Sequence, residues 1–293
     1  MPARFYPLGS VPPYWLGESN IKKQKKRFFQ VRTLELPERR VYHFDQVSST
    51  NSIARLMARC GAAEGTIVMS ESQTSGKGRR SRHWDCPPGK GLLMSMILRP
   101  PIALKEIPQL TLLAGVAVAE SLRRSGIYTA GIKWPNDIII DGKKVCGILA
   151  ESLNSKHYGP TVIVGAGINV NQDISDLPPD CLETSTSLKL KTGSHWPRLQ
   201  VLRELLTRWD LHYQYFLTSG SGYIREKWIQ YNHTLGQNVT ISYGQDSIRG
   251  QAVDISEKGG LMVQLANGEI KEFLADDVSL GRSFYSPDPK KDL

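Results

Sequence analysis

Residues suited to chemistry are concentrated in a short basic loop at positions 76 to 84, with the sequence Gly-Lys-Gly-Arg-Arg-Ser-Arg-His-Trp. The stretch from Ser72 to Trp84 contains no Asp or Glu, while four cations crowd around two glycines. Glycine lets a backbone approach a ligand closely, and neighbouring cations repel one another unless an anion lies among them. The loop therefore predicts a site for a polyanion or a carboxylate. A solvated surface loop or a nucleic-acid patch is the alternative, because bare basic runs are commonly of those kinds.

A second chemical element is the pentapeptide Lys-Trp-Pro-Asn-Asp at positions 133 to 137. Lys133 closes an apolar run, and Pro135 imposes an extended or turn backbone on its surroundings. We expect the lysine to point into a pocket; a strand-end lysine whose ammonium reaches solvent is the alternative. A third element, residues 164–171, places two glycines and two amides at the end of a buried strand. It is a weak signal by itself, because Gly-x-Gly is common.

The elements that must position these residues follow from hydrophobic periodicity. Helical spacing of apolar residues predicts helices at 53–59, 110–122, 198–217 and 223–231. Apolar runs predict strands at 41–44, 65–70, 91–98, 128–133, 137–140, 145–150 and 161–168, with Asp141-Gly142 as a hairpin turn. After Gly236, short strands are expected at 238–243, 247–255, 261–265 and 269–273. The sequence thus predicts a large domain of helices and strands, followed by a small all-β domain.

Composition restricts the class of protein. The chain has 293 residues with 40% hydrophobic content, enough to bury a sizeable core. No apolar run approaches the roughly 18 residues of a membrane span, and prolines interrupt the first twenty residues, unlike a signal peptide. The four cysteines are widely spaced and never form Cys-x-x-Cys, so neither a zinc site nor a disulfide framework is predicted. We expect a cytoplasmic protein that does not contact a membrane.

Most of the net charge of +9 lies near the N-terminus. Residues 1–40 carry nine Lys or Arg and three Glu, which account for +6 of the total. A basic, proline-containing leader without helical periodicity is typical of a solvated tail, so we expect ordered structure to begin at Val41. Basic residues also fit organelle targeting, against which the prolines and the few serines argue. The function of this segment stays open.

The motifs between about Val47 and Leu280 resemble those of the biotin protein ligase family. Six occur in the family's order: Ser49-Thr50-Asn51, Gln73-Thr74, the basic loop, the Lys-Trp-Pro-Asn-Asp pentapeptide, residues 144–149, and Gly165 through Asn169. The pairing of the basic loop and its Trp84 with the pentapeptide is specific to this family rather than to its fold relatives. The resemblance implies an α+β fold, in which helices pack on one side of a mixed sheet as in class II synthetases, followed by a C-terminal SH3-like β-barrel.

The resemblance also implies a two-step reaction, in which ATP activates biotin to biotinyl-5'-AMP and a lysine of an acceptor domain then receives the biotin. Lys133 and Arg79 match the family's catalytic positions, Mg²⁺ accompanies ATP, and no protein ligand for a resident metal is implied. Ser49 and Asn51 equally suit helix caps, and Trp84 equally suits a plain core tryptophan. The ligand-binding positions implied are Ser49, Thr50, Asn51, Gln73, Gly76, Lys77, Gly78, Arg79, Arg82, Trp84, Lys133, Asn136, Gly147, Gly165, Gly167 and Asn169.

Partners and domains follow from the same resemblance. The implied acceptor is the biotin carboxyl carrier protein of acetyl-CoA carboxylase or a similar domain, recognised by strand pairing at a sheet edge. Homodimers occur in the family, and the oligomeric state of this chain stays open. The implied division is a basic, poorly ordered extension at 1–40, a catalytic domain at 41–234 that binds biotin and ATP, an SH3-like domain at 235–283 and a tail at 284–293.

The chain departs from the commonest family loop at Lys77, Ser81 and His83, where arginine, glycine and lysine are usual. Because lysine lacks the bidentate fork of arginine, we expect the departure to change how tightly the loop holds the adenylate.

The sequence argues against three rival functions. A bifunctional ligase and repressor needs a helix-turn-helix domain, for which residues 1–40 are too short and too poor in periodic apolar residues. Lipoate ligases and octanoyl transferases generally lack the basic loop followed by tryptophan. A nucleic-acid-binding module gives no reason for the pentapeptide at 133–137. The prediction is a monofunctional biotin ligase that does not bind nucleic acid.

Overall fold

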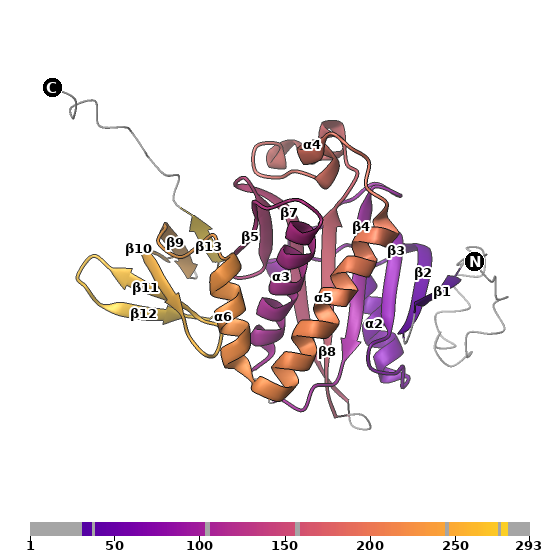
Figure 1. Ribbon diagram of the computed structural model, residues 1–293, viewed down its shortest axis with the longest axis horizontal. Coiled ribbons are helices and arrows are strands. Elements are labelled where there is room, and N and C mark those ends of the chain that lie inside the picture. Colours follow the sequence, from indigo (N-terminus) through magenta and orange to yellow (C-terminus); the bar gives the residue numbers. More distant parts are fainter. Residues whose placement is uncertain are drawn as a thin grey trace.

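The fold was taken from a computed structural model, which describes residues 31–36, 39–102, 106–155, 159–243, 246–274 and 277–280. An eight-stranded mixed sheet forms the larger domain, in the order β1-β2-β3-β4-β8-β7-β6-β5 (Figure 1). Its strands are β1 (Val31–Leu36), β2 (Arg39–Val47), β3 (Ile67–Gln73), β4 (Gly91–Leu98), β5 (Ala130–Lys133), β6 (Asp137–Ile140), β7 (Lys143–Ser155) and β8 (Gly159–Asn169). The α+β fold expected from the sequence is confirmed.

The sheet begins ten residues earlier than the sequence predicts. Strand β1 pairs antiparallel with β2, with Val31 opposite Phe44 and Leu36 opposite Arg39. The expectation of a solvated extension up to residue 40 is therefore wrong for residues 31–36 and for Arg39 and Arg40. The many cations of this segment obscure a short β-type run, Val-Arg-Thr-Leu-Glu-Leu, in which Leu34 and Leu36 alternate with Glu35. The remainder of the expected extension, residues 1–30 and 37–38, and the expected tail, 284–293, lie outside the described residues.

Helices cover both faces of the sheet, whereas the family resemblance implies helices on one side. On one face lie α3 (Ile107–Arg124), α5 (Arg198–Ser219) and α6 (Ser221–Tyr231), as Figure 1 shows. On the other face α2 (Thr50–Arg59) packs against β3, β4 and β8, burying Ala54, Met57, Val68, Ile97 and Ile163 in a second, smaller core. Successive side chains of a strand point to opposite faces, and β4 is buried along its whole length, so both faces need a cover.

Turn chemistry explains the tight connection between β6 and β7. Asp141 and Gly142 both adopt positive φ, at 46° and 79°, as the two central residues of a type I′ hairpin turn require. The predicted Asp-Gly hairpin is confirmed. The segment after β8 is less regular and contains η5 (Ile174–Asp176), η6 (Pro179–Cys181) and the short helix α4 (Leu188–Thr192), none of which the periodicity predicts.

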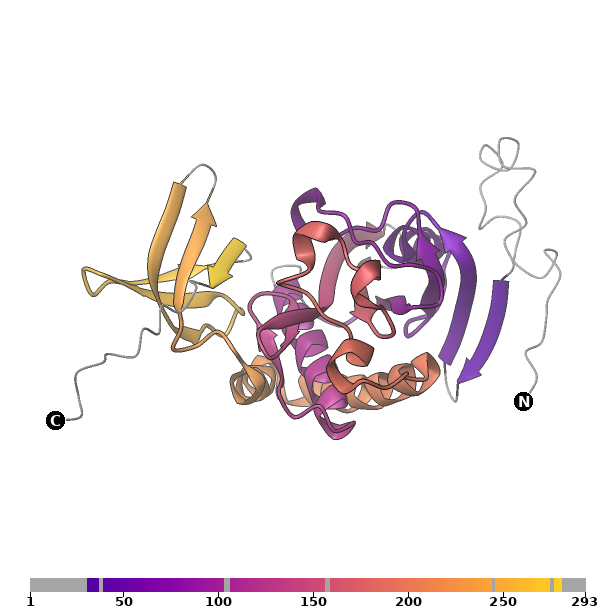
Figure 2. The same ribbon diagram turned by 90° about the horizontal axis from the view of Figure 1, so that it is seen from above.

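The small all-β domain is also confirmed. Its five antiparallel strands are β9 (Asn238–Tyr243), β10 (Asp246–Ile255), β11 (Leu261–Leu265), β12 (Ile270–Phe273) and β13 (Asp277–Leu280), of which β13 was not predicted. The domain lies at one end of the molecule, away from β1 (Figure 2). It is joined to the larger domain by hydrogen bonds from Trp134 Nε1 to the Gly259 carbonyl (2.9 Å) and from Gln109 Nε2 to the Glu257 carbonyl (3.0 Å).

Within the described ranges, no helix has the length and apolar character needed to cross a membrane.

Candidate active site

One cavity gathers the residues that the sequence predicts for a ligand site. It has a volume of about 420 Å³ and lies over β8 and its neighbours. All the predicted positions except Gly76 line it: Ser49, Thr50, Asn51, Gln73, Lys77, Gly78, Arg79, Arg82, Trp84, Lys133, Asn136, Gly147, Gly165, Gly167 and Asn169. These residues come from the start of α2, four strands, the turn between β5 and β6, and the basic loop, so the fold brings together residues that are far apart in the chain.

Strand β8 sets the direction of the cavity. Gly165, Gly167 and Asn169 alternate along it and therefore face the same side of the sheet. Because a strand rises by about 3.3 Å per residue, these three positions mark out a floor roughly 13 Å long. Because the two glycines carry no side chains, the side chains of Asn51 and Trp84 can approach the strand closely there.

The Gly165 end of the floor is closed by buried polar groups. The Ser95 hydroxyl donates to Asn51 Oδ1 at 2.6 Å, and its oxygen lies 2.7 Å from Thr50 Oγ1. The backbone N–H of Thr50 donates to Gln73 Oε1 at 2.8 Å. Buried polar groups that are fully hydrogen-bonded keep fixed directions, so this end presents donors and acceptors in a set arrangement. We name Ser49, Thr50, Asn51, Gln73 and Ser95 the closed end.

Asn51 is fixed from the other side as well. Its Nδ2 donates to Glu151 Oε2 at 2.7 Å and to the Leu149 carbonyl at 3.3 Å, and Arg55 Nη2 holds Glu151 at 3.0 Å. A Cβ atom added to Gly165 would approach Asn51 Oδ1 to 2.1 Å, so only glycine allows the amide to sit on the floor. The sequence alternative that Ser49 caps α2 is not realised, since its side chain makes no cap hydrogen bond.

Trp84 lies over the middle of the floor. A Cβ atom added to Gly167 would come within 2.6 Å of its indole Cε2 and Nε1 atoms, and one added to Gly147 within 2.9 Å of its Cζ3. The ammonium of Lys144 stands 5.5 Å from the ring centroid, within cation–π range. The indole Nε1 is buried and has no partner among the described residues. Trp84 is therefore a wall of the cavity with a donor to offer, rather than a plain core residue.

The basic loop is folded by its own backbone. The N–H of Gly78 donates to the Arg82 carbonyl (2.7 Å), and the N–H of Trp84 donates to the Gly76 carbonyl (3.1 Å). Gly76 does not line the cavity, but a side chain there would meet the Trp84 carbonyl at 2.3 Å, so it permits the loop to close. Arg80, at the tip, adopts a positive φ of 51° and donates to the Ser242 carbonyl of β9 at 3.3 Å. The loop thereby touches the C-terminal domain.

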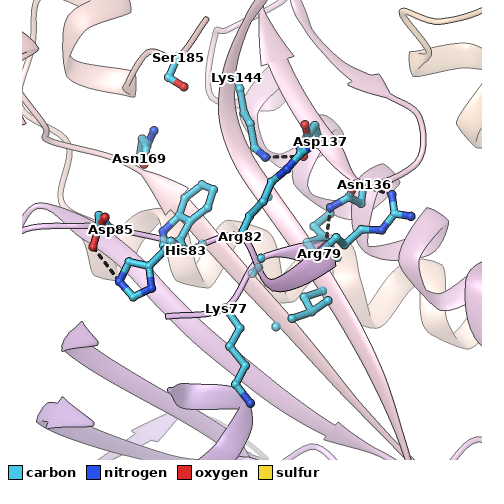
Figure 3. A pocket seen from close by; sticks show the side chains of 18 of the residues that line it. Lys77, Arg79, Arg82, His83, Asp85, Asn136, Asp137, Lys144, Asn169 and Ser185 are labelled. Carbon is cyan, nitrogen blue, oxygen red and sulfur yellow. Dashed lines mark hydrogen bonds and ion pairs between the residues drawn. The ribbon is translucent and has the colours of Figure 1, made fainter. Parts of the chain in front are cut away.

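The cations of the cavity do not all point the same way. Arg79 Nη1 donates to Asn136 Oδ1 at 3.3 Å, and Asn136 is itself fixed through Nδ2 to the Ile148 carbonyl at 2.8 Å. Figure 3 shows Arg79 reaching towards Asn136, whereas Lys77 extends away from it. Lys133, the last residue of β5, lines the cavity as predicted.

Sequence reasoning missed a second lysine. Lys144 Nζ forms an ion pair with Asp137 Oδ1 at 2.6 Å inside the cavity (Figure 3). Both residues belong to motifs quoted above, Asp137 as the last residue of the pentapeptide and Lys144 as the first of residues 144–149. In the sequence, these two charged residues flank the Asp141-Gly142 turn, and the turn brings their strands together.

The wall at the Asn169 end was also missed. We call residues 177–185 the far wall, which contributes to the cavity Leu177, Pro178, Cys181, Thr184 and Ser185. Its last residues pair with β7, because the N–H of Lys144 donates to the Thr184 carbonyl (2.7 Å) and the N–H of Thr186 to the Lys144 carbonyl (2.8 Å). Burial, with the nearby Asp180 charge, raises the pKa of the Cys181 thiol, so Cys181 stays protonated at neutral pH and is no thiolate nucleophile.

Comparison with known proteins identifies the families whose sequences match the two domains. The model of the "Biotin/lipoate A/B protein ligase family" matches residues 43–169, and that of the "Biotin protein ligase C terminal domain" matches residues 234–281. The first range lies within the domain that carries the cavity, and the second covers the small all-β domain. Fold and cavity thus define the enzyme class, a protein ligase of the biotin and lipoate type.

Individual relatives show which kind of protein ligase the chain resembles. The bifunctional ligase/repressor BirA of Bacillus subtilis is 37% identical over 269 residues, which cover 92% of this chain and 80% of that protein. The biotin–[acetyl-CoA-carboxylase] ligase of Mycobacterium tuberculosis is 30% identical over 250 residues, covering 80% and 87%. A solved structure, the biotin protein ligase from Aquifex aeolicus in complex with biotin and ATP, is 34% identical with a TM-score of 0.71, covering 83% of this chain and 99% of that one. The chain belongs to the biotin protein ligase family.

Proposed function

We propose that the protein activates biotin with ATP to biotinyl-5'-AMP and transfers the biotin to a lysine of a biotin carboxyl carrier domain. The observation that carries the proposal is the polarity of the cavity along β8. A closed end of neutral, hydrogen-bonded groups around Asn51 is followed by the glycine floor under Trp84 and then by a region of fixed cations. A neutral ring with an acidic tail, joined to a nucleotide, has this same order of properties.

The closed end suits the ureido ring of biotin. A ureido group carries two N–H donors and one carbonyl acceptor in a fixed plane, and recognition of such a group requires partners with fixed directions. The closed end supplies hydroxyl, amide and backbone groups that hold one another in place. With the ring at Asn51, the valeryl carboxylate would extend along β8 towards the cations.

The cationic region suits the first chemical step. Attack of a carboxylate on the α-phosphate brings two anions together and builds negative charge on the phosphorus oxygens, which fixed cations stabilise. Arg79, Lys133 and Lys144 line this region. We propose that Arg79, oriented by Asn136, contacts the phosphate, and that Lys133 neutralises charge in the transition state.

Mg²⁺ enters as part of the nucleotide. Within the ranges the structure describes, His, Cys, Asp and Glu side chains form no group of three or more suited to hold a metal ion. Mg²⁺ usually keeps several waters and is held by substrate phosphates with one or two carboxylates. Asp137, which lines the cavity, could supply one such oxygen in exchange for its Lys144 partner.

The second step requires the acceptor lysine to lose a proton. A site rich in cations and partly closed to water lowers the pKa of an incoming amine, because both effects disfavour its charged form. The amine then attacks the acyl carbon of biotinyl-AMP, and AMP leaves.

A single labelling assay tests the proposal. The protein is incubated with MgATP, a biotin carboxyl carrier domain and either biotin or lipoate, and the mass of the carrier is measured. We expect the carrier to gain one biotinyl group, with no gain when ATP is omitted or when lipoate replaces biotin. A carrier that stays unmodified with biotin and MgATP would contradict the proposal, and a gain with lipoate would assign the chain to the other branch of its family.

A further inference from the structure

Four charged side chains form an ion-pair network beside the Asn169 end of the cavity. Lys90, in the turn before β4, donates through Nζ to Asp176 Oδ2 at 2.7 Å and to Asp173 Oδ2 at 2.9 Å. Lys189 of α4 donates to the other oxygen of Asp173 at 2.6 Å. We name these four residues the Lys90 clamp. None of them lines the cavity, and the site described above does not use them.

The clamp fixes the turn from which the far wall starts. Asp176 also accepts from the backbone N–H of Asp173 at 2.8 Å, so the two acids enclose the single turn η5 and the lysine closes it. Leu177, the first residue of the far wall, follows directly. The backbone just before the turn is held as well, because the N–H of Asn171 donates to the Lys90 carbonyl at 2.6 Å. Lys90 therefore holds this end of the wall through both its main chain and its side chain.

The opposite end of the far wall is held by Lys144, as described above. Between the two anchors, the backbone hydrogen bonds of residues 178–183 run within the wall or to its end, such as Cys181 N–H to the Pro178 carbonyl at 2.9 Å. A contact to the sheet is the long one from Lys143 Nζ to the Leu182 carbonyl, at 3.4 Å. A segment held mainly at its ends keeps its position only while both anchors hold.

The clamp is charged throughout the neutral pH range. The hydrogen bonds that Lys90 donates to Asp176 and then to Asp173 raise its pKa. Lys189 and then Lys90 lower the pKa of Asp173 to about 2, and Lys90 lowers that of Asp176. The network therefore does not change its charge near neutral pH. Because its four side chains are 19% to 42% exposed, added salt weakens it.

We propose that Lys90 is a positioning residue for the nucleotide: its ammonium holds the far wall in the conformation that completes the ATP half of the cavity. The inference rests on the proposed function, because the closed end takes biotin and so leaves the Asn169 end to the nucleotide. Without the clamp, the wall occupies its binding position for only part of the time, and the apparent affinity for ATP falls by that fraction. Biotin, roughly 13 Å away at the other end of the floor, is unaffected.

The test compares the ends of the cavity in one variant. Lys90→Met keeps the length and apolar stem of the lysine but removes its charge. We expect the KM for ATP to rise by a factor of roughly three to ten, while kcat at saturating ATP stays within about twofold. The dissociation constant for biotin without nucleotide, measured by calorimetry, should match that of the unmodified protein. Lys90→Arg, which can reach both acids with its fork, should restore the KM.

Two further variants separate the clamp from general stability. Asp176→Asn weakens the ion pair but keeps an oxygen for the Asp173 N–H, so it should reproduce the KM increase. Lys191 lies in α4, as Lys189 does, but it pairs with Asp141. Lys191→Met should therefore leave the KM for ATP unchanged. A normal KM in Lys90→Met and Asp176→Asn, an equal effect in Lys191→Met, or joint loss of kcat and biotin binding would each overturn the inference. If the unmodified protein itself shows no turnover, that result contradicts the proposed function rather than this inference.

Discussion

The indole of Trp84 rests directly on Gly167, so that any side chain at position 167 would collide with it. The nearest indole atoms, Cε2 and Nε1, lie 2.6 Å from the place that a Cβ atom would occupy. Such a separation is too short for non-bonded atoms, and the tryptophan or the strand would have to move. The tryptophan closes the basic loop at one end, and the glycine lies in the middle of the cavity floor. The position of the loop therefore depends on the absence of one methyl group.

Gly167→Ala should consequently impair ligation without unfolding the chain. The displaced indole would open the cavity between its two ends, and we expect kcat/KM for biotin to fall about tenfold or more, equivalent to at least ~1.4 kcal/mol. Steady-state labelling of the carrier domain measures the loss. Gly222→Ala is the matched control, because position 222 lies within α6 with no atom near its Cβ, where alanine is tolerated. Equal activity of the two variants would show that the contact does not matter.

The sequence predicts the elements around the cavity well where local sequence signals determine the structure. Strand β4 occupies the predicted 91–98, and Asp141-Gly142 forms the predicted hairpin, because an apolar run and a turn dipeptide specify those elements locally. The motif residues gather in one cavity because the strand order β3-β4-β8-β7-β6-β5 brings together segments that are far apart in the chain. What periodicity cannot predict is the far wall, since irregular backbone carries no repeat and its anchor, Lys90, is 86 residues from Asp176. Strand β1 was not predicted because the basic residues in and around it obscure the alternation of Leu34, Glu35 and Leu36.

Arg79→Gly should convert a selective ligase into a promiscuous one. The variant removes a cation that Asn136 orients towards the cavity, so the loop would hold biotinyl-AMP less tightly and release it to solution. Free biotinyl-AMP acylates any accessible lysine. We expect biotin on a bystander protein such as serum albumin, detected by avidin blot, while the unmodified enzyme labels only the carrier. Arg79→Lys retains the charge and should label the bystander less. Unchanged acceptor selectivity in Arg79→Gly would refute the assignment of Arg79.

Lys133→Ala should abolish the first chemical step. If Lys133 neutralises the charge that develops on the phosphate, its loss removes transition-state stabilisation, and pyrophosphate release should fall by a factor of about 10² or more. Pyrophosphate released from MgATP and biotin is measured without a carrier domain. Lys144→Ala provides the comparison, because that lysine already has Asp137 as a partner and stacks over Trp84. Near-normal release in Lys133→Ala combined with loss in Lys144→Ala would mean that the roles of the two lysines are exchanged.

Acid should weaken the fold through Glu71. Hydrogen bonding from His43, with a further contribution from Arg198, lowers the pKa of Glu71 from 4.5 to about 2 although burial opposes it. Because the folded state favours the carboxylate, this stabilisation is present above pH 4.5 and is lost as the pH falls towards 2. Arg198 also donates to the Gly91 carbonyl at 3.1 Å, which ties α5 to the start of β4.

Glu71→Gln tests that linkage. The variant should lower the free energy of unfolding at pH 7 by on the order of 2 kcal/mol and flatten its decline between pH 5 and pH 3. Urea titrations followed by circular dichroism at several pH values measure both. Arg55→Met, which breaks the more exposed pair with Glu151, should leave the acid dependence in place. The same slope in the unmodified protein and Glu71→Gln would contradict the linkage.

Ser95 should control the biotin end in the way that Lys90 controls the nucleotide end. Its hydroxyl is completely buried and donates to Asn51 Oδ1, so Ser95→Ala leaves that oxygen without its partner and frees the amide to shift. We expect the KM for biotin to rise roughly tenfold, as the loss of a buried hydrogen bond implies, with the KM for ATP unchanged. Ser121→Ala removes a similarly buried hydroxyl from α3 that does not line the cavity, and it should leave both constants unchanged.

Since the closed end and the Lys90 clamp share no contact, the double variant Ser95→Ala/Lys90→Met should show the two KM increases independently. A biotin KM that rises further when Lys90 is also replaced would show that the ends of the cavity are coupled.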